Sequence, residues 1–241
     1  MADDRTLVAD GLRNARDLGG LPRRSGGTTP RGRYFRSESV DRLTERGWDA
    51  VRDAGIRTVV DLRTPEERAQ DTNDRPEWLT TVAVDHDDLQ DTAFWSGYWS
   101  NGLVGTPLYY GPHLDRKPER TAAALAALAR AAPGGAMFHC AGGRDRTGIV
   151  ALVLLALADV EPQAIVDDYL RTLQVSNDLF AAMGVQGQEA RIQALCAEHG
   201  TTVADAFRAV VADFDADRFA ARSGLDADHL EALRTFRAPV T

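Results

Sequence analysis

The chain has 241 residues, of which 44% are hydrophobic and 27% are charged, and its formal net charge is −8. These values are typical of a globular protein and argue against a disordered chain. The acidic balance, without a broad basic stretch, argues against a nucleic-acid partner. Cys140 and Cys196 are the only cysteines, so a disulfide framework is excluded and a reducing compartment is expected.

No segment of the sequence predicts stable membrane insertion. The apolar run from Ile149 to Ala158 is about half the length that a bilayer crossing needs. The stretch "MADDRTLVAD" is acidic and lacks the apolar core of a signal peptide. We therefore expect a cytoplasmic location, with export without a recognisable signal left open and the oligomeric state unassigned.

Strands and helices alternate along the first two thirds of the chain, which predicts an α/β fold with a largely parallel central sheet flanked by helices. The capping-box pattern at Thr64 places proline at the first helical position. In chain order we predict a hairpin over 14–38, a helix over 43–55, a strand over 56–63, a helix opened by Thr64, a strand over 80–85 and a helix over 118–132.

The chain is predicted to become almost wholly helical from about 161 to 238. Amphipathic segments are expected at 161–176, 187–199, 203–213 and 226–236. No linker separates them from the rest, so we expect one domain over 1–241. Residues 176–223 either form a lid over a site or simply pack on the core; the two alternatives are equally favoured.

The stretch "FHCAGGRDRTG" (138–148) lies between a predicted strand, "GGAMF", and the apolar run that begins at Ile149. It is therefore a glycine-bearing loop that leads into a helix N-terminus, where unpaired N–H groups and the helix dipole attract anions. Arg146 can grip two phosphate oxygens with its planar fork. Cys140 lies in the same positive field, which favours the thiolate, and Thr147 could donate its hydroxyl to the sulfur. This pattern predicts phosphoryl transfer through a phosphocysteine.

His139-Cys140, five residues, then Arg146-Thr147-Gly148 resembles the phosphate loop of the protein-tyrosine phosphatase superfamily. The stretches "NARDLGG" (14–20), "RGRYFRSE" (31–38) and "VVDLRTPEE" (59–67) resemble the bacterial tyrosine phosphatases of the mycobacterial protein tyrosine phosphatase B type. Family loops usually have a lysine where this chain has Arg144. The resemblance implies a tyrosine-phosphatase-like fold and phosphatase activity. Arg146, the backbone N–H groups and the helix N-terminus supply positive charge, so we expect no metal and no cofactor.

The resemblance implies that Cys140 is the nucleophile and that Arg146 binds phosphate. The remaining site residues are expected around these two. For phosphate binding they are Ala141, Gly142, Gly143, Arg144, Arg146, Thr147 and Gly148, and for support they are His139, Arg63, Arg16 and Asp17.

Cleavage of a phosphate ester also needs an acid that protonates the leaving oxygen. Asp145 is our first candidate, because it lies in the loop, no Trp-Pro-Asp tripeptide occurs elsewhere, and the family resemblance points to it. Asp61, at the end of a predicted strand, is the second. The third is one residue of the acidic group Asp85, Asp87 and Asp88.

Two other features carry open alternatives. The segment 92–113 is rich in aromatic residues and either walls a substrate pocket or docks onto the core. The stretch "VDHDD" (84–88) reads as a polar loop after a strand rather than as a metal site. Arginines gather near the expected site and are predicted to handle phosphate; they are Arg13, Arg16, Arg31, Arg33, Arg36, Arg63, Arg144 and Arg146.

Three classes of function compete. A phosphate-binding module without catalysis has no use for Cys140 as a nucleophile, and a sulfur-transfer enzyme of the rhodanese type does not explain the Arg-Thr-Gly continuation. A cysteine-dependent phosphatase explains both features. Phosphotyrosine proteins are the first expected substrates, with possible phosphoserine or phosphothreonine activity. Phosphoinositides are the main rival because of the charge of Arg144, and a small phosphorylated metabolite is the third choice.

Overall fold

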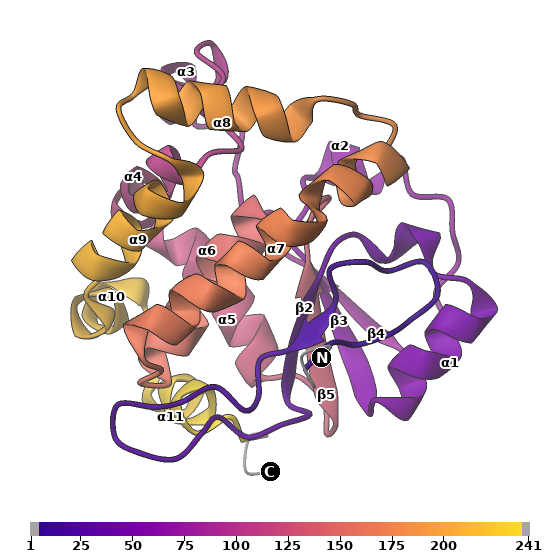
Figure 1. Ribbon diagram of the computed structural model, residues 1–241. Helices are drawn as coiled ribbons and strands as arrows, with labels where there is room; N and C mark the ends of the chain where they lie inside the picture. The colour runs from indigo at the N-terminus through magenta and orange to yellow at the C-terminus, as the bar shows by residue number, and fades with distance from the viewer. Residues whose placement is uncertain (1–4, 238–241) are drawn as a thin grey trace.

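The computed structural model describes residues 5–237, which are built around a five-stranded sheet of order β1-β2-β5-β3-β4 (Figure 1). Only β1 runs antiparallel to its neighbour, and the other four strands are parallel. The predicted fold class is therefore confirmed. The strands are β1 (Arg16–Asp17), β2 (Tyr34–Ser37), β3 (Ile56–Asp61), β4 (Thr80–Ala83) and β5 (Gly135–His139).

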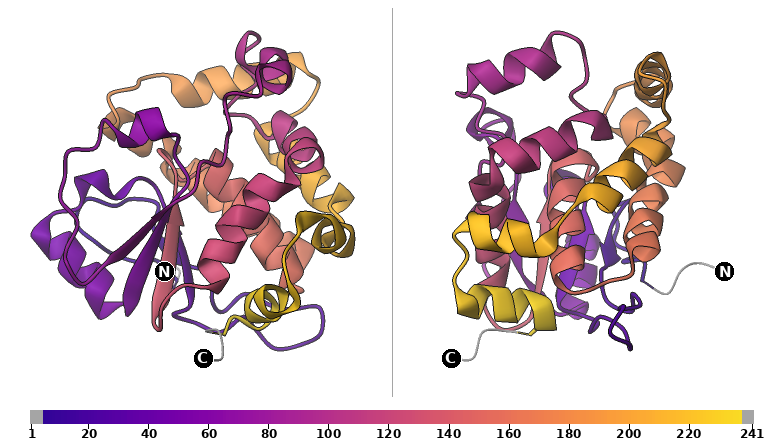
Figure 2. Two further views of the ribbon diagram at one scale, coloured as in Figure 1. Left: turned by 180° about the vertical axis from the view of Figure 1, so that it is seen from behind. Right: turned by 90° about the vertical axis from the view of Figure 1, so that its left-hand side faces the viewer.

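Helices cover both faces of the sheet (Figures 1 and 2). Those before the phosphate loop are α1 (Glu45–Asp53), α2 (Pro65–Arg68), α3 (Thr92–Trp99), α4 (Tyr110–Arg116) and α5 (Pro118–Ala129), with short 3₁₀ turns at Val40–Arg42 and Pro107–Tyr109. Those after it are α6 (Asp145–Leu157), α7 (Pro162–Ala182), α8 (Gln188–Glu198), α9 (Val203–Asp213), α10 (Ala216–Ser223) and α11 (Ala227–Thr235).

Side chains that alternate along the strands build two apolar clusters, one on each face of the sheet. In β5, Met137 joins the cluster that contains Val51 of α1, whereas Phe138 joins the larger cluster on the other side. In β3, Val59 and Val60 divide in the same way. Both faces of the central strands are therefore buried, which is the usual state of a parallel sheet.

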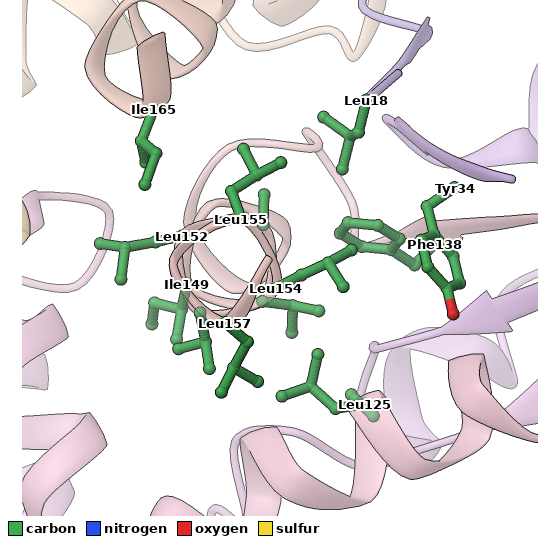
Figure 3. Packing of buried hydrophobic residues seen from close by; sticks show 14 of the residues in the cluster. Leu18, Tyr34, Leu125, Phe138, Ile149, Leu152, Leu154, Leu155, Leu157 and Ile165 are labelled. Carbon is green, nitrogen blue, oxygen red and sulfur yellow. The ribbon is translucent and has the colours of Figure 1, made fainter. Parts of the chain in front are cut away.

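The helix that follows the phosphate loop runs through the larger cluster. Figure 3 shows α6 with leucine side chains on several of its sides, meeting Leu125 of α5, Phe138 of β5 and Ile165 of α7. The apolar run from Ile149 predicts this burial, because a helix that is hydrophobic all round has no face for water. This packing holds the N-terminus of α6 beside the carboxyl end of the central strand β5.

The predicted elements all occur, but their ends differ and three helices were not predicted. Helix α2 closes after a single turn, and α3, α4 and α10 were not foreseen. Within the aromatic segment, Asp91 caps α3 by accepting the N–H of Phe94. Residue 238, the last of the predicted helical part, and the start of "MADDRTLVAD" lie outside the described residues. Across residues 5–237, no helix combines the length and apolar character that a membrane crossing requires.

Candidate active site

Cys140 follows β5, the central strand, and loop 140–144 leads from it into α6. The neighbouring strands β2 and β3 end at Ser37 and Asp61, so three parallel carboxyl ends and a helix N-terminus meet at this point, as expected. Gly143 has a φ of +64°, and a Cβ there would lie 2.3 Å from the carbonyl oxygen of Ser37. Glycine is therefore required where the loop presses against β2.

Four consecutive carbonyl oxygens of the loop accept hydrogen bonds from donors behind it. Within residues 5–237, by contrast, none of the N–H groups of 141–144 finds an acceptor. The loop thus exposes donors toward an incoming anion and keeps its acceptors at the back. The four bonds are His139 Nδ1 to Cys140 (3.0 Å), Ser39 N to Ala141 (2.9 Å), Asn14 Nδ2 to Gly142 (3.3 Å) and Arg36 Nη2 to Gly143 (2.9 Å).

A buried cluster of positive charge supports the back of the loop. Asp168 of α7 accepts hydrogen bonds from Arg5 (3.0 Å), Arg16 (2.9 Å) and Arg36 (2.9 Å). Burial opposes ionisation of Asp168, but the arginines outweigh it and hold the pKa of this carboxyl far below its usual range. Burial also lowers the pKa of Arg36 to about 10. Arg16 in addition donates to Asn14 Oδ1 at 2.7 Å, so it supports the site indirectly, from behind.

Cys140 is only 3% exposed, and its sulfur has one hydroxyl partner. Thr147, in the first turn of α6, donates to the Sγ atom at 3.3 Å. A hydrogen bond to sulfur stabilises negative charge on it. The predicted contact between these two side chains is therefore present.

Arg146 is held by two carboxylates from outside the loop. Glu67 of α2 takes both Nη atoms, at 2.8 Å for the Nη2–Oε1 pair, and Asp87 Oδ2 lies 3.2 Å from Nη1. Burial opposes ionisation of Glu67, but the bonds from Arg146 outweigh it and lower the pKa of Glu67. Among the described residues, no acceptor occupies Nε of Arg146. The Nε edge is the one that a guanidinium uses for a side-on grip of a phosphate.

Glu67 also completes the capping box of α2. Its Oε2 atom accepts the N–H of Thr64 at 2.9 Å, while the Thr64 hydroxyl accepts the N–H of Glu67. The capping box predicted from the sequence is therefore present. One carboxylate thus closes a helix cap and fixes the orientation of Arg146.

Asp145, the first residue of α6, is oriented by a buried tyrosine. Tyr110 donates its hydroxyl to Asp145 Oδ1 at 2.7 Å, and the Tyr169 hydroxyl lies 3.3 Å from that of Tyr110. Burial, followed by the charge of Asp145, raises the pKa of Tyr110 well above its usual value, so its proton stays in this bond. The second carboxylate oxygen of Asp145 has no such partner in the described part of the chain.

Asp61 lies at the end of β3 but is engaged with protein groups. It accepts the backbone N–H of Arg63 at 3.0 Å and the Arg63 guanidinium at 2.8 Å, and His139 Nε2 lies 3.9 Å away. Burial opposes ionisation, but Arg63 outweighs it and lowers the pKa of Asp61. Arg63 also pairs with Asp41 and Asp71. This network braces the end of β3 next to the loop.

The three aspartates of the acidic group have different surroundings. Asp87 faces Arg146, as described above. Asp88 pairs with Lys117 (3.2 Å) and Arg120 (2.9 Å), and Asp85 accepts the N–H of Asp88. Among the described residues, only Asp87 of the three therefore pairs with Arg146.

Arg144 is buried and forms an ion pair with α8. Its side chain is 2% exposed and its Nη1 atom lies 2.5 Å from Glu189 Oε2 of α8. The charge of Arg144 is therefore balanced by α8, the helix at the top of Figure 1. This ion pair joins the loop to the segment 176–223, for which a lid and simple packing on the core were the two alternatives.

Several of the other predicted residues lie elsewhere. Asp17 accepts the N–H groups of Gly19 and Gly32, both at 2.8 Å, and so holds the turn between β1 and β2. Arg33 donates to Gly134 at the amino end of β5, opposite to the site. Of the arginines expected to handle phosphate, only Arg146 contributes to the lining of the cavity beside the loop.

A cavity of about 650 Å³ opens in front of Asp145 and Arg146. The turn after α3 and the helix α8 form two of its sides, so part of the aromatic segment does wall the pocket while Trp95 and Tyr110 dock into the core. The charged lining residues are Glu66, Glu67, Asp87, Asp145, Arg146 and Arg191, and the apolar ones are Leu89, Trp99, Val104, Tyr109, Ile192 and Leu195. A separate apolar groove between α4, α9 and α10 contains none of the loop residues.

Comparison with known families agrees with this geometry. A family model described as "Tyrosine phosphatase family" matches residues 7–236, which is nearly the whole chain. The chain belongs to the tyrosine phosphatase family.

Three relatives of this family member have names in the same class. A protein of Cupriavidus necator whose name assigns it to the tyrosine-protein phosphatases is 30% identical over 70% of the chain. A tyrosine-protein phosphatase of Nostoc commune is 30% identical over 58%, and the triple specificity protein phosphatase PtpB of Mycobacterium tuberculosis is 31% identical over 58%. The matched segments span 63%, 48% and 61% of these relatives, which is less than two thirds of each.

Four residues that contact the loop or its side chains were not predicted from the sequence to belong to this site. Two of them left a signal in the sequence: Glu67 belongs to the capping box, and Asn14 begins the "NARDLGG" stretch. The other two approach the loop only in the folded chain, and nothing in their local pattern marks them. The four residues are Asn14, Glu67, Tyr110 and Glu189.

Proposed function

We propose that this chain hydrolyses phosphate monoesters through a phosphocysteine intermediate. The observation that carries the proposal is the loop after Cys140. Among the described residues its N–H groups at 141–144 have no acceptor, whereas the carbonyls of 140–143 all accept hydrogen bonds. A phosphate group in this cradle would face the sulfur and the free Nε edge of Arg146. Membership in the tyrosine phosphatase family supports the same chemistry.

In the proposed first step, the Cys140 thiolate attacks phosphorus, the S–P bond forms and the P–O bond to the leaving group breaks. Asp145 gives its proton to the leaving oxygen. In the second step water attacks phosphorus, Asp145 takes a proton from the water, the S–P bond breaks and the thiolate is restored. Thr147, which donates to Sγ, stabilises that thiolate when it leaves.

Protein phosphotyrosine is the proposed first substrate, with phosphoserine and phosphothreonine as further substrates. The apolar wall formed by Leu89, Val104 and Ile192 suits an aromatic ring that reaches from the surface to the loop. The name of the PtpB relative, a triple specificity phosphatase, supports a broad range. Arg144, the reason for considering phosphoinositides, is balanced by Glu189, which favours substrates with a single phosphate.

Phosphoinositides or small phosphorylated metabolites are the alternative substrates. One observation favours them: Arg191 of α8 lines the cavity and is exposed, so a second anionic group of a substrate could reach it. A panel of phosphotyrosine and phosphoserine peptides, phosphoinositides and nucleotides on the purified protein separates these classes. Highest kcat/KM on phosphoinositides would reverse our order.

The mechanism is tested with Cys140→Ser. This variant should lose turnover of aryl phosphates and keep oxyanion binding, because an alcohol near neutral pH is a poor nucleophile without a base. Rapid quenching of the parent with ³²P-labelled substrate should trap label on Cys140. Turnover by the serine variant near the parental level would contradict the mechanism and favour a non-catalytic role for the cysteine.

The charge stabilisation is proposed to come from the loop and Arg146 alone. Activity should therefore survive a chelator and be inhibited by vanadate, which mimics the five-coordinate state of phosphorus. Arg146→Lys should be severely impaired, because an ammonium group cannot reproduce the two-point grip. Loss of activity with chelator that a divalent ion restores would show metal-dependent chemistry instead.

A further inference from the structure

The cavity in front of the loop poses an electrostatic problem for the proposed function. Four carboxyl side chains line it, against the two arginines Arg146 and Arg191. A phosphate monoester near neutral pH is largely a dianion, so it would enter a pocket with an excess of negative charge. Asp145 is already an acid in the proposed mechanism, and neutralising one further carboxyl group would favour tight binding.

Glu67 is not the group that becomes neutral. Its two oxygens hold both Nη atoms of Arg146 and one of them also accepts the Thr64 N–H, three bonds that require or favour the ionised form. Glu67 thereby already balances the charge of Arg146 in the free protein. Any further carboxylate at Arg146 is in excess.

Asp87 is that further carboxylate. Its backbone carbonyl is held by Trp95 Nε1 (3.0 Å) and Lys117 Nζ (3.3 Å), which fixes the chain after β4. Its side chain is 14% exposed and reaches Arg146 Nη1 at 3.2 Å. The ion-pair distance is longer than that of Glu67, and the Nη1 atom is shared. Of the two carboxylates at the Arg146 guanidinium, Asp87 is therefore the more weakly bound.

Phosphate binding at Arg146 should raise the pKa of Asp87 further. Burial is the largest influence and raises the pKa of Asp87 to about 6; Arg146 opposes this, and neighbouring carboxylates add to it. A phosphate on Arg146 adds two more negative charges. The charged groups near Asp87 are Arg146 and Asp145 of α6, Glu67 of α2, Asp85 of its own loop and Lys117, which binds its carbonyl oxygen.

We propose that Asp87 takes up a proton when the phosphate group binds and stands in the complex as a neutral acid that donates a hydrogen bond to a phosphate oxygen. The proton comes from solvent, one carboxyl oxygen becomes a hydroxyl, and no bond in the substrate changes. This inference rests on the proposed function, because it needs phosphate in the loop. Asp145 keeps the separate task of protonating the leaving oxygen.

Oxyanion binding and protonation of Asp87 should favour each other. In the free protein Asp87 is largely ionised at pH 7, and binding raises its pKa, so each binding event takes up close to one proton there. Oxyanion affinity should then fall about tenfold for each pH unit above 6, until the pH passes the pKa of the complex. Without Asp87 the affinity should not follow this slope.

The test uses sulfate, which remains a dianion over this pH range, and the Cys140→Ser protein, which removes the thiol titration. Calorimetry at pH 7 in two buffers with different ionisation enthalpies counts the protons taken up. We expect the uptake to fall by nearly one proton when Asp87→Asn is added to Cys140→Ser, while any proton that Asp145 takes up is counted in both proteins. Between pH 6 and pH 8 the sulfate affinity of the double variant should also fall less steeply than that of Cys140→Ser alone, by about one factor of ten for each pH unit.

Glu66→Gln in the same background is the matched control. Glu66 lines the same cavity and its substitution changes the formal charge equally, but it does not contact Arg146. Proton uptake should persist in this variant. An uptake that Asp87→Asn leaves unchanged, or that Glu66→Gln lowers by the same amount, would overturn the assignment to Asp87.

Infrared difference spectra of the Cys140→Ser protein should show a protonated carboxyl band on sulfate addition, and this measurement does not depend on the folding of Asp87→Asn. No such band would contradict the proposal. If the Cys140→Ser protein bound neither sulfate nor vanadate, the phosphate loop itself would be refuted, whereas binding without proton uptake would refute only the role of Asp87.

Discussion

The proposed nucleophile Cys140 and the proposed phosphate-binding residue Arg146 are both held by neighbouring side chains. Thr147 holds the sulfur and Glu67 holds the guanidinium. The third proposed participant, Asp145, is held on one oxygen by Tyr110, which leaves the other oxygen for a proton. The precision of the site therefore depends on these three pairs.

At the scale of single residues, the first prediction concerns Asp145→Asn. The variant should lose roughly 10²- to 10⁴-fold in kcat on alkyl phosphates, because their leaving oxygens need a proton. The loss should be much smaller on activated aryl phosphates. Steady-state kinetics across a series of leaving groups measures the difference. Equal losses in all members of the series would mean that Asp145 only shapes the loop.

Asp61→Asn is the comparison for Asp145. The structure surrounds Asp61 with Arg63, so this substitution should act through the stability of the loop and affect all leaving groups alike. A loss confined to poor leaving groups in Asp61→Asn would transfer the role of acid to that residue.

The second prediction concerns Tyr110→Phe, which removes one hydroxyl and keeps the ring in the core. Asp145 then loses its orienting bond, so kcat should fall mainly on poor leaving groups, by about tenfold for a bond of roughly 1–1.5 kcal/mol. Tyr98→Phe is the control, because Tyr98 does not line the cavity. A fall of equal size on good and poor leaving groups would indicate a general packing defect.

Between elements, α8 and the phosphate loop are joined by the pair Glu189–Arg144. Arg144 is buried, so removing its partner leaves a charge without compensation. The turn after α3 approaches α8 near Leu195, and a Cβ on Gly102 would lie 3.5 Å from this side chain. Helix α8 therefore rests on this ion pair and on the buried side chains of Ile192 and Cys196, which belong to the larger apolar cluster.

The third prediction is that Glu189→Gln loosens α8. Hydrogen exchange of the amides in α8 should accelerate about tenfold for each 1.4 kcal/mol lost, while β5 stays protected. Glu198→Gln at the other end of α8 is exposed and serves as the control. Unchanged exchange in Glu189→Gln would show that α8 packs independently of the loop, as part of the core and not as a lid.

At the scale of the whole molecule, Asp168 connects distant parts of the chain. It joins Arg5, Arg16 and Arg36 of the N-terminal hairpin region to α7, across more than a hundred residues of sequence. The two apolar clusters share the same sheet between them. We propose on these grounds that the chain folds as one domain.

The fourth prediction is that Asp168→Asn destabilises the whole protein. Three buried arginines lose their common counter-charge, so the free energy of unfolding should fall by about 3–5 kcal/mol, and unfolding should remain a single transition. Asp167→Asn, at the neighbouring exposed position, should change it by no more than about 0.5 kcal/mol. Two separate transitions in urea would contradict the one-domain proposal.

The pH dependence of this contribution has a definite sign. The pKa of Asp168 is lowered in the folded state, so its stabilisation is present above the unfolded value of about 4 and is lost as the pH falls below it. The difference in stability between parent and Asp168→Asn should therefore shrink under acid conditions.

Most of the elements, and the two residues proposed to act on phosphate, could be predicted from the amino-acid sequence by itself. Alternating β-branched strands, the apolar run of α6 and the capping box at Thr64 are local patterns, set by periodicity and by hydrogen bonds within a few residues. The strand–loop–helix around Cys140 is equally local, so Cys140 and Arg146 could be proposed as site residues from their spacing and the glycines between them.

Only the tertiary structure decided which charges meet. Arg16, Arg36, Arg144 and Arg146 look alike in the sequence, yet Asp168, Glu189 and Glu67 divide them between the back of the loop, α8 and the cavity. Asp61 and Asp87 are likewise similar until Arg63 engages one of them and Arg146 meets the other. The reason is physical: a side chain's charge and proton affinity depend on burial and on partners brought together by the packing of distant elements, which no local pattern encodes.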